Sequence, residues 1–457
     1  MTAVTETLSS FVAGLSTDMI PAPVMTRAKM LVLDCIGNIV RARRDSESTP
    51  ALLATVRAVG LDKGNAHVFG DEATYSPAGA ALLNATLAHS LDFDDTHAAA
   101  IVHAAAPVVP AALAAAEMVG ATGAELLVGI VAGYETVLRV ALALPPAAHY
   151  QRGFHPSATA GVFGAAAAAA RIFRLDPATT ASAFGIALSQ SAGSLQFLAN
   201  GAWTKRFQVG WAAMSGFFAA TLAREGFKGA TAAIEGRYGF LRAYAPAPEP
   251  DRVVRNLGTV WELMLTAIKP YPSCRWGHAG VDAALALREA HHWKPEEIEA
   301  VTLGISRAGM LLIGEPAEKK ADPANIVDAQ FSGPFVIACA LATGRLVWDS
   351  YRDLTDPKIR DLMRRVRCEN DPEIEANFPA NMSGKLTVKA RGRLHSKTVI
   401  VPKGEPKNFL SETELRAKFY GLAGTMLGGE HAVTFADTVL ALDRLDQASA
   451  LFTEAWQ

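Results

Sequence analysis

Cysteine is scarce in this chain, and no paired cysteine motif is present. The four cysteines, Cys35, Cys274, Cys339 and Cys368, are widely separated and include no CxxC pair. This spacing argues against a disulfide framework and against a cysteine-ligated zinc site. We therefore expect a protein of a reducing compartment and assign it to the cytoplasm.

Signals for secretion or membrane insertion are also missing. The amino-terminal segment has no basic region followed by a long apolar stretch. The longest uncharged stretch, residues 98–116, consists mostly of alanine and contains Pro107 and Pro110. Alanine is weakly apolar and proline disturbs a helix, so we expect no membrane-spanning helix and no membrane partner.

Charge of either sign is limited. Charged residues make up 19% of the chain, and 43 Lys plus Arg nearly balance 45 Asp plus Glu. No global field favours nucleic acid, so any anion must be recognised locally. Hydrophobic residues make up 50% of the chain, which predicts a large interior, about two or three domains and some surface hidden in an oligomer.

The common nucleotide-binding and hydrolase motifs are absent. The chain has no GxxxxGK[ST] loop, no GxGxxG after a predicted strand and no GxSxG elbow. Phosphate loops and nucleophile elbows depend on these glycine patterns. We therefore expect neither a nucleotide cofactor nor an α/β-hydrolase, and we predict an enzyme that uses no cofactor.

What the chain does contain is helical periodicity and small residues. Apolar residues recur at helical spacing from the start to about residue 265, and alanine and glycine are dense in these runs. Small side chains let helices approach closely. The pattern predicts a mainly α protein with a large all-helical domain over residues 1–267.

The pattern changes after residue 267. Residues 297–306 alternate as in a strand, and two alternating runs around Gly392 are typical of a β-hairpin. Helices are predicted from about Gly280 to His291 and from near Asp328. Residues 268–403 are thus predicted to form a smaller α+β domain. Helical spacing returns over 404–457, and periodicity alone leaves open whether these helices rejoin the first domain.

A dense polar segment lies between two predicted helices. The stretch HSLDFDDTH, residues 89–97, holds three aspartates, a threonine and two histidines, and His103 follows it. Histidine is suited to general acid or base chemistry, which makes His103 a candidate, and Asp92, Asp95 and Thr96 would orient an imidazole or bind a substrate hydroxyl. The alternative is an exposed polar turn that caps a helix.

A metal site is a further interpretation of this segment. Four residues would supply the ligands: Asp92, Asp95, His97 and His103. No HxxxH or HExxH pattern supports this alternative. We therefore predict no bound metal and favour acid–base chemistry.

Two more segments carry candidate residues in the helical part. His155 precedes Pro156 and an alanine-rich helix, where free backbone N–H groups favour an anion, although it is otherwise an ordinary loop histidine. Lys205, with Arg206 beside it, lies between Trp203 and Phe207, and a partly shielded cation would hold a carboxylate. A solvated charge pair is the alternative.

The loop KPYPSCRWGH brings three basic residues to the predicted domain boundary. These are Lys269, Arg275 and His278. Ligand sites favour such boundaries. We therefore include all three in the predicted site.

Six segments, taken in order, resemble the MmgE/PrpD family: AHSLDFDDTH, RGFHPSATAG, AFGIALSQSAGSLQF, TKRFQVGWAAMSG, KPYPSCRWGHAGVDAAL and DAQFSGPF. The family includes 2-methylcitrate dehydratase, cis-aconitate decarboxylase and iminodisuccinate epimerase. The resemblance implies a helical domain that includes the last helices, an inserted α+β lid, a homodimer and a small polycarboxylate substrate. It also implies the site residues Asp92, Thr96, His103, His155, Lys205 and His278.

Two positions depart from the pattern of the family. Gln208 stands where many members have a histidine, and Phe335 stands where several have a tyrosine. A phenol that would donate a proton is therefore missing at position 335. This departure counts against a direct transfer of the decarboxylase mechanism.

The chemistry shared by this family predicts a division of labour. His103 and His155 would act as base and acid, assisted by Asp92, and His278 would join them from the lid. Lys205 and Arg275 would hold the carboxylates and stabilise enolate-like charge as it forms. We assign substrate binding to Thr96, Gln208, Lys269 and Arg275.

The reaction expected from these residues and from the resemblance is dehydration of a hydroxy di- or tricarboxylate by a lyase. The rivals are an epimerase or isomerase, a decarboxylase acting on a related acid, a metal-dependent enzyme and a non-catalytic helical scaffold.

Overall fold

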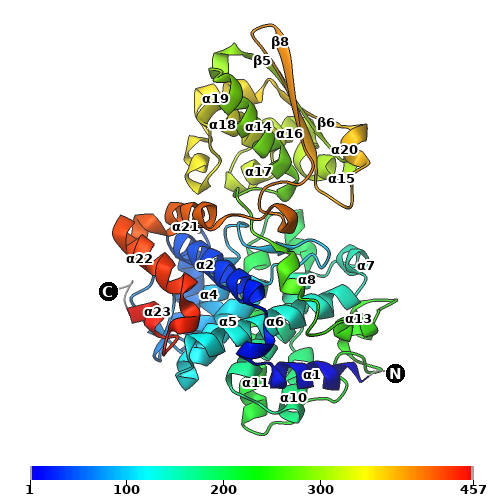
Figure 1. Ribbon diagram of the computed structural model, residues 1–457, viewed down its shortest axis with the longest axis vertical. Coiled ribbons are helices and arrows are strands. Elements are labelled where there is room, and N and C mark those ends of the chain that lie inside the picture. The colour runs from blue at the N-terminus through cyan, green and yellow to red at the C-terminus, as the bar shows by residue number, and fades with distance from the viewer. Residues whose placement is uncertain (1–2, 454–457) are drawn as a thin grey trace. The chain divides into compact units, whose positions relative to one another are not determined.

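The computed structural model describes residues 3–453 and divides into two compact units (Figure 1). The helical unit runs to Ala267 and resumes at Glu412, and the α+β unit is Ile268–Ser411. The sequence pattern predicted an end of the α+β domain at residue 403. Residues 404–411 lie in the α+β unit, where the N–H of Ile268 donates to the carbonyl of Gly404 over 3.1 Å.

The chain is mainly helical, as predicted, and the helical unit contains most of the helices. Its longer helices are α1 (Val4–Gly14), α2 (Ala22–Asp45), α3 (Thr49–Ala58), α4 (Pro77–Ala88), α5 (Ala105–Val119), α6 (Gly123–Ala143), α9 (Gly161–Ile172), α10 (Pro177–Leu188), α11 (Thr204–Arg224), α21 (Glu412–Leu427) and α22 (Gly429–Leu440). Shorter ones are α7 (Pro146–Gln151), α8 (Pro156–Thr159), α12 (Phe240–Tyr244), α13 (Asp251–Val254) and α23 (Ala450–Thr453).

Small residues allow the central helices α6, α9 and α11 to pack closely. A Cβ atom at Gly164 of α9 would lie 2.9 Å from the carbonyl oxygen of Gly133 in α6. A Cβ atom at Gly216 of α11 would lie 2.5 Å from the carbonyl oxygen of Val162 in α9. These separations leave no room for a methyl group, which explains why glycine and alanine are dense in these helices.

The last long helices pack on the amino-terminal helix α2. Figure 1 shows α21 and α22, in orange and red, beside the dark blue α2. The side chains of Phe419 and Leu422 in α21 lie against Gly37 of α2, where a Cβ atom would be 3.2 Å and 3.3 Å from them. The two ends of the chain therefore build one hydrophobic core.

Helix α6 is long and apolar enough to cross a membrane by length and composition, but its apolar window is wholly buried inside the protein. Burial on all sides is typical of the central helix of a large helical core. Its start is well defined, because Thr122 and Glu125 form a capping box.

The α+β unit contains a four-stranded sheet in the order β6-β5-β7-β8. Its strands are β5 (Ile298–Ile305), β6 (Val366–Asn370), β7 (Gly384–Ala390) and β8 (Arg393–Val399). Strand β5 is parallel to β6 and antiparallel to β7. The predicted strand over 297–306 is thus confirmed as β5, whereas β6 was not predicted from the sequence.

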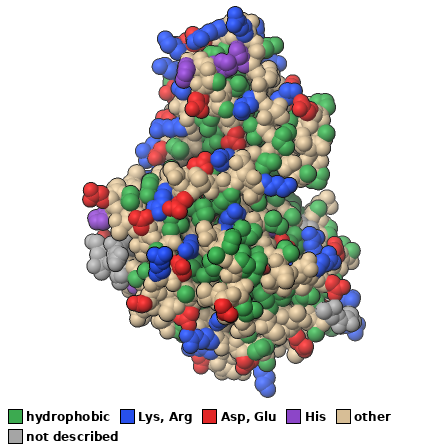
Figure 2. All heavy atoms as spheres, in the orientation of Figure 1, with side chains coloured by type: hydrophobic (Ala, Val, Ile, Leu, Met, Phe, Trp, Pro, Cys, Tyr) green, Lys and Arg blue, Asp and Glu red, His purple; other side chains and the backbone are tan. Residues whose placement is uncertain are grey.

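The predicted hairpin is also confirmed. Strands β7 and β8 pair through a turn at Arg391 and Gly392, whose φ angles of 51° and 73° are both left-handed, as a two-residue hairpin turn requires. Figure 2 shows Lys, Arg and His side chains gathered at this end of the α+β unit.

Helices cover the sheet of the α+β unit and complete its core. The predicted helices correspond to α14 (His278–His291), which packs against β7 and β8, and to α17 (Ile326–Gln330) followed by α18 (Gly333–Thr343). The unit also contains α15 (Arg307–Gly309), α16 (Ala317–Lys320), α19 (Pro357–Met363) and α20 (Pro372–Glu375).

Candidate active site

The segment between α4 and α5 forms the centre of the candidate site. Helix α4 ends at Ala88 and His89 follows it directly. The backbone turns at Asp92, whose φ of 53° lies in the left-handed region that aspartate tolerates better than most residues. Strand β3 (Thr96–His97) then pairs with β4 (Thr266–Ala267) and anchors the end of the segment.

Asp94 lies between two imidazoles. Its Oδ2 is 2.7 Å from Nδ1 of His89, and its Oδ1 is 3.3 Å from Nδ1 of His103. Burial alone would raise the pKa of Asp94, but the rings of His103 and His89 hold that pKa well below its ordinary value. Asp94 is therefore an ionised carboxylate that is hydrogen-bonded to His89 and within ion-pair distance of His103.

His89 and His103 differ in their environment. The side chain of His89 is fully buried, whereas that of His103 is 14% exposed. Burial lowers the pKa of His89 to about 4, although the charge of Asp94 opposes this shift. His89 is therefore neutral at neutral pH and donates its Nδ1 proton to Asp94. His103 is the member of the pair that can meet a substrate.

His155 joins these residues in a cluster of three imidazoles. Its ring centroid lies 5.7 Å from that of His89, which in turn lies 4.7 Å from that of His103. Burial, followed by the neighbouring His89 and Lys205, lowers the pKa of His155 well below its ordinary value. His155 occupies the N-cap position of α8, as its place before Pro156 predicts.

Gln208 holds His155 in place. Its Oε1 lies 3.3 Å from Nδ1 of His155, and its Nε2 donates to the carbonyl of Ser194 over 2.9 Å. An amide fixed in this way accepts from the Nδ1–H of the ring and leaves Nε2 of His155 unprotonated. The residue that replaces the family histidine is therefore part of the site, in contact with a predicted acid or base.

Lys205 supplies the positive charge of the site. It lies in the first turn of α11 and forms an ion pair with Asp92, and the two side chains are 27% and 16% exposed. Burial would lower the pKa of Lys205, but the charge and hydrogen bond of Asp92 outweigh that effect and raise it. The flanking Trp203 and Phe207 are 44% and 43% exposed, so these two rings are turned largely to solvent.

The residues of the alternative metal site have other partners. Asp95 accepts hydrogen bonds from the hydroxyl of Tyr134 over 2.8 Å and from the N–H of Ala105 over 3.1 Å. Nε2 of His97 lies 3.6 Å from Oε2 of Glu262. Because Asp95 is buried beside Asp94, its pKa is raised well above its ordinary value. Through these two hydrogen bonds Asp95 ties the segment to α5 and α6.

A different trio, His89, Asp94 and His103, offers ligand atoms within 4.8 Å of one another. Ligands that share a tetrahedral Zn²⁺ ion at about 2.1 Å lie about 3.4 Å apart. The 2.7 Å contact between His89 and Asp94 is too short for this arrangement and fits a hydrogen bond.

Thr96 is the least engaged of the predicted residues of the helical unit. Its Oγ1 atom is buried and has no hydrogen-bond partner among the residues that the structure describes. The hydroxyl is therefore available to a ligand that reaches it, which keeps Thr96 among the predicted binding residues.

The predicted residues of the α+β unit are placed within that unit. Arg275 forms an ion pair with Glu405, and Nε2 of His278 lies 3.1 Å from the carbonyl of Ser273. Lys269 is 5% exposed. His278 begins α14, and its ring contacts that of Tyr271 edge-on at 5.4 Å. Arg275 thus already has a carboxylate partner.

Phe335 is buried in the core of the α+β unit. Its ring stacks on that of Tyr351 at a centroid distance of 5.7 Å. The hydroxyl of Tyr351 donates to the carbonyl of Pro272 in the KPYPSCRWGH loop. A phenol is therefore present next to position 335, although position 335 itself lacks one.

Family models match nearly the whole chain. The MmgE/PrpD N-terminal domain matches residues 6–253 and the MmgE/PrpD C-terminal domain matches residues 271–444. The chain belongs to the MmgE/PrpD family. It is therefore an enzyme of the MmgE/PrpD family, and the resemblance stated from the sequence is confirmed.

Among curated relatives of this MmgE/PrpD enzyme are several named for cis-aconitate. A cis-aconitate decarboxylase-like protein of Aspergillus oryzae is 28% identical, covering 98% of this chain and 96% of the relative. The cis-aconitate decarboxylase of Aspergillus terreus is 27% identical over 98% of this chain and 95% of its own. The human cis-aconitate decarboxylase is 25% identical over 99% and 94%.

Two residues of the MmgE/PrpD site were not singled out from the sequence. They are His89 and Asp94, which lie in the same segment as the predicted Asp92 and Thr96. The density of acids and imidazoles marked the segment. The left-handed turn at Asp92, which gives the neighbouring carboxylates different partners, is not marked in the sequence.

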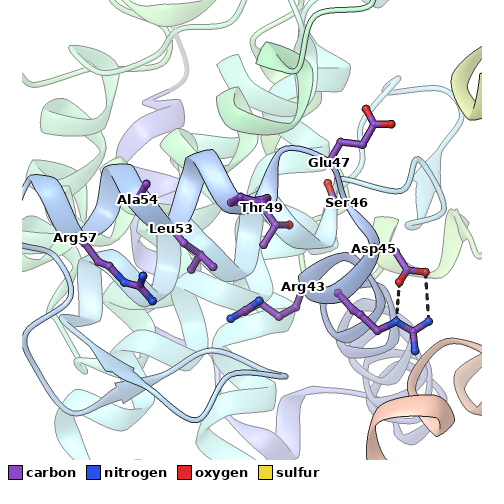
Figure 3. Close-up of a pocket in the computed structure, with 10 residues that line it drawn as sticks. Arg43, Asp45, Ser46, Glu47, Thr49, Leu53, Ala54 and Arg57 are labelled. Carbon is purple, nitrogen blue, oxygen red and sulfur yellow. Dashed lines mark hydrogen bonds and ion pairs between the residues drawn. The ribbon is translucent and has the colours of Figure 1, made fainter.

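A separate hollow lies at the α2–α3 turn of the helical unit, with a volume of about 570 Å³ (Figure 3). Arg43, Arg44 and Arg57 line it, and Arg44 pairs with Asp45. None of the predicted site residues lines this hollow. The hollow is therefore separate from the histidine cluster, which is the candidate active site.

Proposed function

We propose that this MmgE/PrpD enzyme is a cofactor-independent lyase that acts on a small polycarboxylate, and that decarboxylation of a cis-aconitate-like acid is its first candidate reaction. The observation that carries the proposal is the buried Asp94 between His89 and His103, with His155 and Lys205 beside them. The names of the relatives favour decarboxylation over the dehydration expected from the sequence.

The proposed reaction needs a cation and a proton donor. As carbon dioxide leaves, the carbon–carbon bond breaks and its electron pair moves into the neighbouring unsaturated acid. Lys205 would stabilise the negative charge that develops on the remaining carboxylate. A proton must then reach carbon, and His103 is the donor we favour because it is partly exposed and lies beside the carboxylate of Asp94.

His155 would have a second role. Its lowered pKa makes it a neutral ring at neutral pH, suited to accept a proton or a hydrogen bond. In a dehydratase or an epimerase the same pair would remove a proton from one carbon and deliver one elsewhere. Decarboxylation, dehydration and epimerisation therefore use the same groups and differ in the bond that breaks.

The test is turnover of a panel of acids in heavy water, followed by NMR. The panel contains cis-aconitate, citrate, 2-methylcitrate and iminodisuccinate. Release of carbon dioxide with deuterium on the product supports the decarboxylase, a new alkene from a hydroxy acid supports the dehydratase, and exchange of an α-proton without an alkene supports the epimerase. No turnover with any acid would overturn the proposal and favour the scaffold.

Variants connect the activity to the site. Loss of one acid–base group costs about 10²- to 10⁴-fold in rate, so we expect His103→Gln to lose most turnover. Lys205→Met removes the cation that stabilises the developing negative charge and should also lose most turnover. His431→Gln, a histidine exposed on α22, is the matched control and should keep full activity. Treatment with a chelator should leave turnover unchanged, because no step of the proposal uses a metal ion.

We also propose a cytoplasmic homodimer. The outer face of α11 supports the dimer, since Trp203, Phe207, Trp211 and Phe218 follow helical spacing and are all exposed. Aromatic side chains have about 150–250 Å² of surface each, so this face offers several hundred Å² towards the roughly 800 Å² that each partner buries in a stable interface. A second copy fits because a twofold axis would pair this uncharged face with itself.

A further inference from the structure

Helix α21 places a lysine directly behind the candidate site. Nζ of Lys418 lies 2.5 Å from Oδ1 of Asp34 in α2, and the two side chains are only 5% and 1% exposed. The same ammonium donates to the carbonyl of Phe93 over 2.8 Å and lies 3.8 Å from the centroid of the Phe93 ring. One buried cation therefore holds the residue between Asp92 and Asp94.

The carbonyl of Phe93 has a second, weaker donor. Nδ2 of Asn38 lies 3.4 Å from this oxygen and also donates to the backbone carbonyl of Asp34 over 2.9 Å. A hydrogen bond from a charged donor is roughly twice as strong as one from a neutral amide. Lys418 is therefore the main group that fixes this peptide, and the peptide sets the directions of the adjacent Asp92 and Asp94.

Lys418 also balances charge in a crowded interior. Three buried carboxyl groups, those of Asp34, Asp94 and Asp95, influence one another. Asp95 has its own partners in Tyr134 and Ala105, and Asp94 faces the imidazoles, so Asp34 is the carboxylate that Lys418 contacts and compensates. Removal of one partner from a buried ion pair leaves an uncompensated charge, which here would act on the nearby histidine cluster.

We propose that Lys418 is a positioning residue of the active site, which fixes the Phe93 carbonyl and neutralises Asp34 so that Asp92 and Asp94 face Lys205 and the histidines. It acts through these groups and needs no contact with the substrate. The effect on turnover rests on the proposed function, whereas the effect on the imidazoles does not.

The chain offers a matched control for this lysine. Lys29 in α2 forms an ion pair of 2.9 Å with Asp443, and these side chains are 17% and 38% exposed. Both pairs join α2 to the carboxy-terminal part of the helical unit. Only the Lys418 pair is buried and contacts the site segment.

The experiment compares Lys418→Met, the double variant Asp34→Asn with Lys418→Met, and Lys29→Met. We expect Lys418→Met to lower kcat by about 10- to 100-fold with a smaller change in KM, as for other losses of outer positioning contacts. The double variant removes the uncompensated charge and should recover the urea midpoint of the wild type. Its kcat should stay low, because the Phe93 carbonyl still lacks its charged donor.

Histidine-labelled NMR gives a readout that needs no substrate. In Lys418→Met, the ring signals of the three-histidine cluster should shift and titrate at higher pH, while Lys29→Met should superimpose on the wild type. If the wild type turns over no acid, the proposed function fails and these spectra still decide the role of Lys418. The role is overturned if the double variant regains wild-type kcat and ring signals together with stability, or if Lys418→Met matches Lys29→Met.

Discussion

At the scale of single residues, the protein keeps several ionisable groups in forms that they do not hold in water. His155 and His89 are buried and neutral at neutral pH, and burial raises the pKa of Asp95 well above its ordinary value. The pKa shifts of the histidines and of Asp95 have opposite consequences for stability. The effect of each residue on stability can therefore be measured by substituting one residue at a time.

The lowered pKa of His155 predicts that the protein loses stability as the pH falls. Below about pH 6.5 the unfolded chain binds a proton at His155 that the folded protein does not bind, so this residue makes stability fall as pH falls. Asp95 acts in the other direction. Its proton is kept in the folded state and lost from the unfolded chain above about pH 4, so stability falls as pH rises.

We expect His155→Gln to reduce the slope of unfolding free energy against pH, and Asp95→Asn to increase it. Each change is at most about 1.4 kcal/mol per pH unit, the value for one proton. Urea denaturation at several pH values between about 4.5 and 6.5 measures both slopes. Equal slopes in the wild type and the two variants would contradict the shifts.

The candidate site shows how far single residues can be predicted. His103, His155, Lys205 and Asp92 were predicted and lie together in the helical unit. Asp94 was missed because three consecutive or near-consecutive aspartates look equivalent in sequence. Their different partners follow from a left-handed backbone angle at Asp92 and from Tyr134, a helix away.

At the scale of elements, the helices of the helical unit pack through faces that carry small side chains. The density of alanine and glycine predicted this packing, and α9 and α11 show its physical form. Strand β6 was not predicted, because its burial does not alternate clearly and its partner β5 lies far away in the sequence. Its parallel pairing is a long-range contact that local periodicity does not encode.

Gly216 should be intolerant of even one methyl group. Its Cβ would lie 2.5 Å from both the Val162 carbonyl oxygen and the Cβ of Ala165, so Gly216→Ala must push α11 away from α9. Overpacking of this kind costs about 1–3 kcal/mol. Gly421→Ala in α21 is the control, because no atom lies within 4 Å of its Cβ position, and it should gain up to about 1 kcal/mol. Thermal unfolding of the two variants gives the comparison, and a stabilised Gly216→Ala would contradict the packing.

At the scale of the whole molecule, the proposed dimer interface is the exposed aromatic face of α11. Its first turn also carries Lys205, and Gln208 follows on the same helix. A second copy bound to this face would therefore stiffen the segment that supplies the cation of the site.

The double variant Trp211→Glu with Phe218→Glu should be a monomer, because two copies would bring four carboxylates into the interface. Light scattering after size exclusion measures the mass, and Lys228→Glu is the control for an added acidic group at an exposed position. A wild-type monomer, or a double variant that remains a dimer, would exclude this face as the interface.

The pairing of α2 with α21 has a consequence for how the chain is made. The Phe93 carbonyl accepts a hydrogen bond from Lys418, which lies 325 residues further along the chain. The α+β unit is continuous in sequence and can fold as soon as it has left the ribosome, whereas the helical unit must stay incomplete until its last helices emerge. During synthesis, the amino-terminal helices are therefore made first but become native last. Until α21 has left the ribosome, the face of α2 that binds it is open to chaperones.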